Sequence, residues 1–176
     1  LASGRAGRHA DRLRAALTAL PRYRAVAAHA GDPDFDLKLT FADEERALEE
    51  DPAFRALSGP RERPDVVFRF RYILCLGGND VGSNFILGAN SNALVLREET
   101  GWEVFFDPLF RPWEHYVPLA PAAADLREKL AWARRNPARC REMVRAAQAA
   151  CRVLAAPAVR RAMLGGILDG LGLRDR

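Results

Sequence analysis

The sequence predicts an α/β protein with a Rossmann-like, mostly parallel sheet flanked by helices, followed by a helical C-terminal tail. Two short apolar runs, Tyr72–Leu76 and Ala93–Leu96, are separated by glycines and polar residues that suit a turn and a helix start. Strands that alternate with helices in this way favour a parallel layer. A chain of 176 residues is expected to form one domain over 1–176, with the helical tail beginning at about residue 123.

The N-terminal third is predicted to contain a helix, a strand and a broken helical region. Leucines and alanines recur at helical spacing in Arg8–Leu20, and Pro21 is expected to end that helix. Charged and apolar residues alternate in Asp34–Thr40, which predicts a short strand. Phe41–Leu57 is expected to be helical in pieces, with an interruption at Pro52.

The middle of the chain is predicted to form the sheet. Ser58–Pro64 (SGPRERP) is expected to be a loop because of its glycine and prolines. The stretch Arg69–Leu96 then reads as strand, turn, helix and strand. After an aromatic loop, Tyr116–Leu119 is expected to be one more short strand.

The C-terminal part is predicted to be helical. Apolar residues share one face of Asp125–Arg135, which indicates an amphipathic helix. Asn136 is expected to cap the next helix, with Pro137 at its first position and its end near Ala155. Pro157 is expected to break this helix before a last helical piece.

Composition indicates a folded protein and excludes several classes. Hydrophobic residues make up 49% and charged residues 28%, as in globular domains. No apolar run is long enough to span a bilayer, and residues 1–14 lack the apolar core of a secretion signal, which predicts a cytoplasmic protein, with the inner face of the membrane as an alternative. The start at Leu1 suggests a fragment.

The net charge of +4 comes from arginine, with 25 Arg against 2 Lys. Such Arg- and Ala-rich usage is typical of GC-rich bacterial genomes. A surplus of Arg also suits a partner that carries phosphate, because the guanidinium group grips phosphate with two hydrogen bonds. No dense basic run or zinc spacing supports nucleic-acid binding, so no nucleic-acid partner is expected.

The cysteines and histidines predict neither a disulfide framework nor a metal site. Cys75, Cys140 and Cys151 are widely spaced and odd in number, and each lies in an apolar strand or an Ala-rich helix. We therefore expect three buried thiols in a reducing compartment. His9 and His29 have no companions that would complete a metal site.

The turn Gly77–Asn84 is the first candidate for chemistry. Glycines after a strand allow a tight turn, and free N–H groups at the start of the following helix form an anion site. Asn79, Asp80, Ser83 and Asn84 would add side-chain hydrogen bonds to a phosphate or a sugar. A plain helix N-cap accounts for the same residues equally well, because the spacing matches neither GxGxxG nor a P-loop.

The aromatic loop 102–116 is the second candidate. Its aromatic side chains suit stacking on a base or a sugar, and Glu103 or His115 would bind hydroxyl groups. The structural alternative is a loop pinned to the core by its aromatics, with His115 hydrogen-bonded inside it.

A longer pattern resembles glycosyltransferase family 90, which includes bacterial lipopolysaccharide- and capsule-modifying transferases and animal protein O-glucosyltransferases. The resemblance is firm from about Phe70 to Cys151 and faint before Pro64. It is carried by RYILCLGGND (71–80), SNFIL and ANSNALVL (83–96), WEVFF (102–106), PLFRPWEHYVPL (108–119) and DLREKLAWARRNP (125–137).

The resemblance implies the C-terminal, donor-binding half of a two-domain GT-B enzyme that uses a nucleotide-sugar and requires no metal or other cofactor. The turn from Gly78 to Asn84, with Val81 and Gly82 inside it, would match the family's donor-binding loop. Arg12 is the best match for a family arginine near the phosphates.

Two departures from the family pattern bear on the chemistry. Animal members carry Arg where this chain has Asn84, and many bacterial members carry Lys where it has Ile86, so another arginine or the helix N-terminus would have to contact the diphosphate. The acceptor-side domain, which supplies the family's catalytic carboxylate, would precede Leu1, so the catalytic base is unknown.

Two hypotheses follow. The first is the donor-binding part of a glycosyltransferase, with a nucleotide-sugar and a glycan acceptor such as lipopolysaccharide or capsule as partners, completed by a missing N-terminal domain or a homo-oligomer. The second is a truncated, non-catalytic remnant that binds a nucleotide or a protein. A generic Rossmann-like nucleotide binder is a third reading, and it requires the family match to be accidental.

Overall fold

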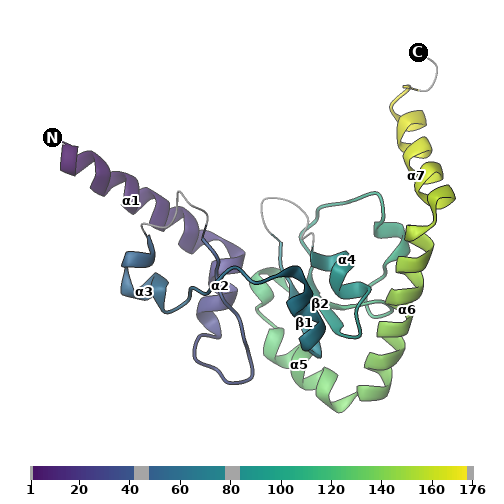
Figure 1. Cartoon of the computed structure of the whole chain (residues 1–176), viewed down its shortest axis with the longest axis horizontal. Coiled ribbons are helices and arrows are strands. Elements are labelled where there is room, and N and C mark those ends of the chain that lie inside the picture. The colour runs from purple at the N-terminus through teal and green to yellow at the C-terminus, as the bar shows by residue number, and fades with distance from the viewer. Residues whose placement is uncertain (1, 42–47, 78–83, 174–176) are drawn as a thin grey trace. The chain divides into compact units, whose positions relative to one another are not determined.

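The computed structural model describes residues 2–41, 48–77 and 84–173, and it divides the chain into two compact units (Figure 1). The first unit comprises residues 1–63 with 122–124, and the second comprises 64–121 with 125–176. The sequence alone led us to expect a single domain. Each unit is described here by itself.

The first unit is a small helical assembly. It contains α1 (Ala2–Ala19), α2 (Pro21–Ala28) and the single turn α3 (Pro52–Arg55). Pro21 does end the first helix as expected, but it also occupies the first position of α2, where its missing N–H group costs nothing. Pro52 likewise begins α3, and the Asp51 side chain caps this turn by accepting a hydrogen bond from the Ala53 amide at 2.9 Å.

The first unit has a small core, and its predicted strand is absent. Val26, Leu39 and Leu57 form a buried cluster, and Phe54 is buried as well. Asp34–Thr40 forms no strand; within it, only Leu39 makes an isolated parallel bridge, to Ser58. The alternating pattern supplied one apolar face, but a strand also needs a neighbouring strand to pair with along its length.

The second unit contains the parallel sheet that the sequence predicts. Its strands are β1 (Tyr72–Cys75), β2 (Leu94–Glu98) and β3 (Val117–Leu119), in the order β1-β2-β3, and both pairings are parallel. The helix α4 (Asn84–Ala89) lies between β1 and β2 in the chain. Three short 3-10 helices complete the connections: Pro64–Arg69, Asp107–Leu109 and Pro121–Ala123.

Three longer helices follow the sheet (Figure 1). They are α5 (Leu126–Arg135), α6 (Pro137–Ala155) and α7 (Pro157–Gly170). Leu126, Leu130 and Ala133 are buried, which confirms the amphipathic pattern expected for α5. Pro157 ends α6 as expected and occupies the first position of α7.

Asn136 acts differently from the expected N-cap. Its side chain makes no capping bond to α6, although its backbone carbonyl accepts the first helical hydrogen bond, from Cys140. Instead, the side-chain amide turns back and donates to the Trp132 carbonyl at 2.8 Å, which closes the end of α5.

Aromatic and small side chains from the sheet, α4, α6 and the loop before β3 form one buried cluster of the second unit. Its largest members are Phe85, Phe110 and Tyr116, whose rings meet edge to face. Ala147, Ala150, Cys151 and Leu154 of α6 complete the same cluster. All three cysteines are buried and free, as expected. A three-stranded parallel sheet covered by helices confirms the predicted fold class.

Candidate functional site

The carboxyl ends of the parallel strands bring one polar group next to the glycine turn. Glu98, the last residue of β2, is only 5% exposed, and its Oε2 atom accepts a hydrogen bond from the Gly77 amide at 2.9 Å. Gly77 follows β1 after Leu76. Open α/β sheets bind ligands outside the carboxyl ends of their strands, so this edge is the natural place for a ligand.

Gly77 is required here by close packing. A Cβ atom at this position would overlap the Cγ2 methyl group of Thr100 and would lie 3.4 Å from Glu98 Oε2. The hollow that these residues share with Phe85, Arg97 and their neighbours holds only about 10 Å³, which is room for one water molecule. Residues 77, 98 and 100 therefore hold the two strand ends together.

Asn84 connects the start of α4 to β1. Its Oδ1 atom accepts the Cys75 thiol hydrogen bond at 3.0 Å, and its Nδ2 atom donates to the Leu74 carbonyl at 3.2 Å. Both polar ends of the side chain are thus used inside the fold. The Asn84 side chain holds the helix against the strand, whether or not its backbone also meets a ligand.

A cation lies next to this edge. The Arg97 guanidinium is stacked 4.5 Å from the centre of the Phe85 ring and 5.3 Å from that of Tyr116. It also donates to Asp107 Oδ1 at 3.1 Å, and its side chain is 14% exposed. Burial, followed by the charge and hydrogen bond of Glu99, raises the pKa of Tyr116, so its phenol stays neutral at physiological pH.

The aromatic loop after β2 offers exposed rings beside this edge. Trp102 is 57% exposed and Phe105 is 43% exposed. Glu103, between them, is also exposed. These side chains are free to stack on or bind to a ligand without any rearrangement of the core.

His115 is held inside its own loop. It is buried, its Nδ1 atom accepts a hydrogen bond from the Arg111 amide at 2.9 Å, and its ring meets Phe110 edge to face. On the same turn, Arg111 and Glu114 form a two-pronged ion pair at 2.6 and 2.7 Å. This pair raises the pKa of Arg111 and lowers that of Glu114. His115 thus matches the structural alternative, and its assignment to donor binding stays a prediction.

The structure does not test the donor assignment of the remaining predicted residues. Gly78, Asn79, Asp80, Val81, Gly82 and Ser83 lie outside the described residues. Arg12 is exposed on α1, in the other compact unit. The assignments of these residues to the donor therefore stay predictions. Among residues 2–41, 48–77 and 84–173, no group of three or more His, Cys, Asp or Glu side chains could hold a metal ion.

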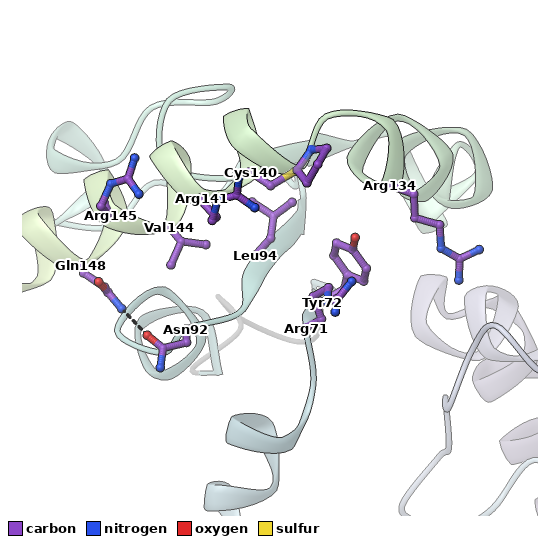
Figure 2. Close-up of a pocket in the computed structure, with 11 residues that line it drawn as sticks. Arg71, Tyr72, Asn92, Leu94, Arg134, Cys140, Arg141, Val144, Arg145 and Gln148 are labelled. Atoms are coloured by element: carbon purple, nitrogen blue, oxygen red, sulfur yellow. Dashed lines mark hydrogen bonds between the residues drawn. The ribbon is translucent and has the colours of Figure 1, made fainter.

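A larger pocket lies at the opposite, amino-terminal edge of the sheet (Figure 2). Its volume is about 560 Å³, within the usual range for ligand sites. It lies between the beginnings of β1 and β2 and one face of α6. The lining residues are Arg71, Tyr72, Asn92, Leu94, Arg134, Pro137, Cys140, Arg141, Val144, Arg145 and Gln148.

Sequence reasoning did not find Glu98, Thr100 or this second pocket. The strand register that places Cys75 opposite Arg97 also brings residues 77 and 98 together. No local sequence motif indicates that pairing. The only available signal was the run Arg97-Glu98-Glu99 directly after an apolar stretch. The pocket is assembled from three separate segments, so no single stretch of sequence indicates it.

A parallel sheet with helices on it and a closely packed glycine, Gly77, at its carboxyl edge place the chain in the class of ligand-binding α/β folds. Comparison with known families then identifies it further. The model of glycosyl transferase family 90 matches residues 36–159, which is most of the chain. The chain belongs to glycosyl transferase family 90.

Relatives among known proteins are viral and mammalian. Uncharacterized protein 035R of Invertebrate iridescent virus 3 is 40% identical over 57 residues, which are 32% of this chain and 5% of that protein. Protein O-glucosyltransferase 3 of Rattus norvegicus is 29% identical over 90 residues, 51% of this chain and 18% of the relative. The human protein of that name is 27% identical over 90 residues, which are again 51% of this chain and 18% of the relative. The chain thus spans less than a fifth of these relatives. None of its described helices is long and apolar enough to cross a membrane.

Proposed function

We propose that this chain is the donor-binding part of a glycosyltransferase, which transfers a sugar from a nucleotide-sugar to a hydroxyl group of a glycan such as lipopolysaccharide or capsule. The observation that carries the proposal is the family match over 36–159, which includes the parallel sheet and Gly77 at its carboxyl edge. Nucleotide ligands commonly bind at that edge of such sheets.

The reaction requires three things. The acceptor oxygen forms a bond to the anomeric carbon, while the bond from that carbon to the diphosphate oxygen breaks. The hydroxyl proton passes to a general base, and the departing diphosphate needs nearby positive charge or N–H donors. This chain would hold the leaving group and the sugar; the general base is not assigned to any of its residues.

In this proposal the described residues build the support for the donor loop. Glu98 and Thr100 hold Gly77, and Asn84 holds the start of α4, so both residues that flank the predicted donor loop are fixed by contacts inside the fold. The exposed rings of Trp102 and Phe105 would stack on the base or the sugar. No metal is required by this scheme.

A second acceptor class is favoured by the mammalian relatives, whose name states that they are protein O-glucosyltransferases. We therefore include a protein hydroxyl group as an alternative acceptor. The donor side of the proposal is the same for both acceptors, so it can be tested first.

Calorimetric titration of the chain with a panel of nucleotide-sugars tests donor binding. We expect at least one member to bind, and the free nucleoside diphosphate to compete with it. Replacing Trp102 with Ala should weaken binding by about 5- to 150-fold, the range of a lost stacking contact. The matched control is Phe68→Ala, which removes another exposed ring, 59% exposed.

Two outcomes would contradict parts of this proposal. If no nucleotide-sugar bound, donor binding by this chain would be wrong. If donors bound but Trp102→Ala and Phe68→Ala behaved alike, the stacking role of the loop after β2 would be wrong, while donor binding would stand.

A further inference from the structure

The pocket at the amino-terminal edge of the sheet has the composition of an anion site. Four of its lining residues are arginines, Arg71, Arg134, Arg141 and Arg145, and none is acidic. The whole chain carries 27 basic and 23 acidic residues, so an average pocket would contain nearly as many carboxylates as cations. The pocket thus gathers positive side chains without any negative ones.

Three of these arginines have no partner among the described residues that would neutralise them. Within the described part of the chain, the side chains of Arg71, Arg141 and Arg145 form neither an ion pair nor a hydrogen bond. Other exposed arginines of the same unit are paired, such as Arg111 with Glu114 and Arg139 with Glu142. The pocket therefore keeps unused guanidinium donors that a ligand can bind.

The arginines stand around an apolar floor. Leu94 and Cys140 are buried, and Tyr72 and Val144 are half-buried beside them. Figure 2 shows Arg141 and Val144 extending from α6 on the same side as Leu94. Residues 137, 140, 141, 144, 145 and 148 recur at helical spacing, so one continuous face of α6 forms the wall.

Hydrogen bonds from the Gln148 side-chain amide close one end of the pocket. Gln148 Nε2 donates to the Ser91 carbonyl at 2.9 Å and to Asn92 Oδ1 at 3.1 Å, which ties α6 to the beginning of β2 (Figure 2). At the other end, Pro137 begins α6, whose first turn has the positive end of the helix dipole. The α6 wall is thus held in position, and the charged groups along it are all positive.

We infer that this pocket is a second ligand site, which binds an organic phosphate through its arginines and an apolar part of the same molecule on its floor. Guanidinium groups bind phosphate oxygens with two parallel hydrogen bonds, and several of them suit a ligand with more than one negative charge. A volume of about 560 Å³ admits such a molecule together with its organic part. The pocket is separate from the carboxyl edge of the sheet, so this inference can be tested independently of donor binding at that edge.

The same chemistry comes from a soluble nucleotide or from a phospholipid headgroup, and the test separates them. The whole chain is titrated calorimetrically with inorganic pyrophosphate and with a nucleoside diphosphate. In a second arm, it is mixed with phosphatidylcholine vesicles that contain or lack phosphatidic acid, and co-sedimentation is measured. The variant is Arg141→Ala/Arg145→Ala. The control is Arg160→Ala/Arg161→Ala, which removes the same charge from exposed positions on α7.

We expect the pocket variant to weaken binding of at least one phosphate probe by tenfold or more, and the control variant to change it by less than threefold. Raising the salt concentration should weaken the binding of the phosphate probes to the unmodified chain, because salt screens the charges of the arginines. A second variant, Val144→Trp, fills the floor and keeps every charge; it should weaken the organic phosphate more than pyrophosphate.

Equal affinities of the pocket and control variants for every probe would overturn the inference, as would an absence of binding by the unmodified chain. The inference would also be overturned if both double variants lost the same amount of affinity for the phosphate probes. Such a result would show that binding depends on the total positive charge of the surface and not on this pocket. Far-ultraviolet circular dichroism of each variant confirms that it is folded before binding is compared.

Discussion

Individual side chains at the carboxyl edge of the sheet are used to hold the backbone in place. Glu98, Asn84 and Arg97 each make a hydrogen bond inside the fold, with Gly77, Cys75 and Asp107 respectively. Buried polar groups that are fully paired fix a local geometry, whereas an unpaired one would cost stability. The exposed groups that remain for a ligand are therefore those of the loop after β2.

The contact between Gly77 and Thr100 gives a test at the residue scale. Gly77→Ala should lower the free energy of unfolding by about 1–3 kcal/mol, because the new methyl group overlaps Thr100 Cγ2. Thr100→Ser removes that methyl group but keeps the hydroxyl group, which accepts the Trp102 amide at 3.4 Å. Urea unfolding of the two single variants and the double variant measures the coupling.

Thr100→Ser alone should be nearly neutral and should restore most of the stability lost in Gly77→Ala. If Gly77→Ala cost the same in both backgrounds, steric overlap with Thr100 would not be the reason for a glycine at this position.

Secondary-structure elements were predicted well where their signals are local. The two strands could be predicted from their continuous apolar runs, and α5 from the recurrence of apolar residues at a helical period. Prolines were harder to interpret. Pro21, Pro52 and Pro157 were expected to end or interrupt helices, and each also begins one, because proline fits the first turn as well as it disrupts the interior.

The missed features depend on partners that are distant in sequence. Asp34–Thr40 has a strand pattern but only the one bridge of Leu39 to Ser58. The hydrogen bond of Glu98 to Gly77 follows from the register of β1 and β2, which the turn residues do not specify. The turn Gly77–Asn84 could be singled out because its polar residues are contiguous in the sequence, and its donor role stays a prediction because residues 78–83 lie outside the described residues.

The corner between α5 and α6 gives a test at the scale of elements. Asn136→Ala removes the side-chain bond to the Trp132 carbonyl and should lower the free energy of unfolding by about 0.5–1.5 kcal/mol. Asn90→Ala is the matched control, because Asn90 is exposed and its side chain makes no hydrogen bond within the described residues. Thermal or urea unfolding of both variants measures the difference.

Equal losses in these two variants would show that the Asn136 side chain does not stabilise the corner. In that case the change of direction would depend on Pro137 and the backbone bond from Cys140 to the Asn136 carbonyl.

At the scale of the whole molecule, the two compact units differ in how much core they contain. Among the described residues, the second unit buries more hydrophobic side chains, from its sheet, α4, α5 and α6, than the first unit, whose buried side chains include Val26, Leu39, Phe54 and Leu57. The second unit therefore contributes most of the hydrophobic burial that stabilises the described chain. Its buried titratable groups then determine how that stability responds to pH.

Three of these groups predict a loss of stability in alkali. Burial raises the pKa of the Cys140 and Cys151 thiols and of the Tyr116 phenol. Below the ordinary thiol pKa of 9.0, the folded and unfolded chains both keep these protons, so the contribution is fully present. As pH rises further, the unfolded chain ionises first, and the free energy of unfolding falls. The maximum slope is about 1.4 kcal/mol per pH unit for each group.

Urea unfolding between pH 8 and pH 11, with a reductant present, measures this slope. The double variant Cys140→Ala/Cys151→Ala removes both thiols, so its stability should fall less steeply between about pH 9 and 10, where the cysteines begin to titrate in the unfolded chain. Tyr116 is common to both proteins, so its contribution cancels in the comparison. Parallel slopes would show that the thiols do not ionise differently in the folded and unfolded states.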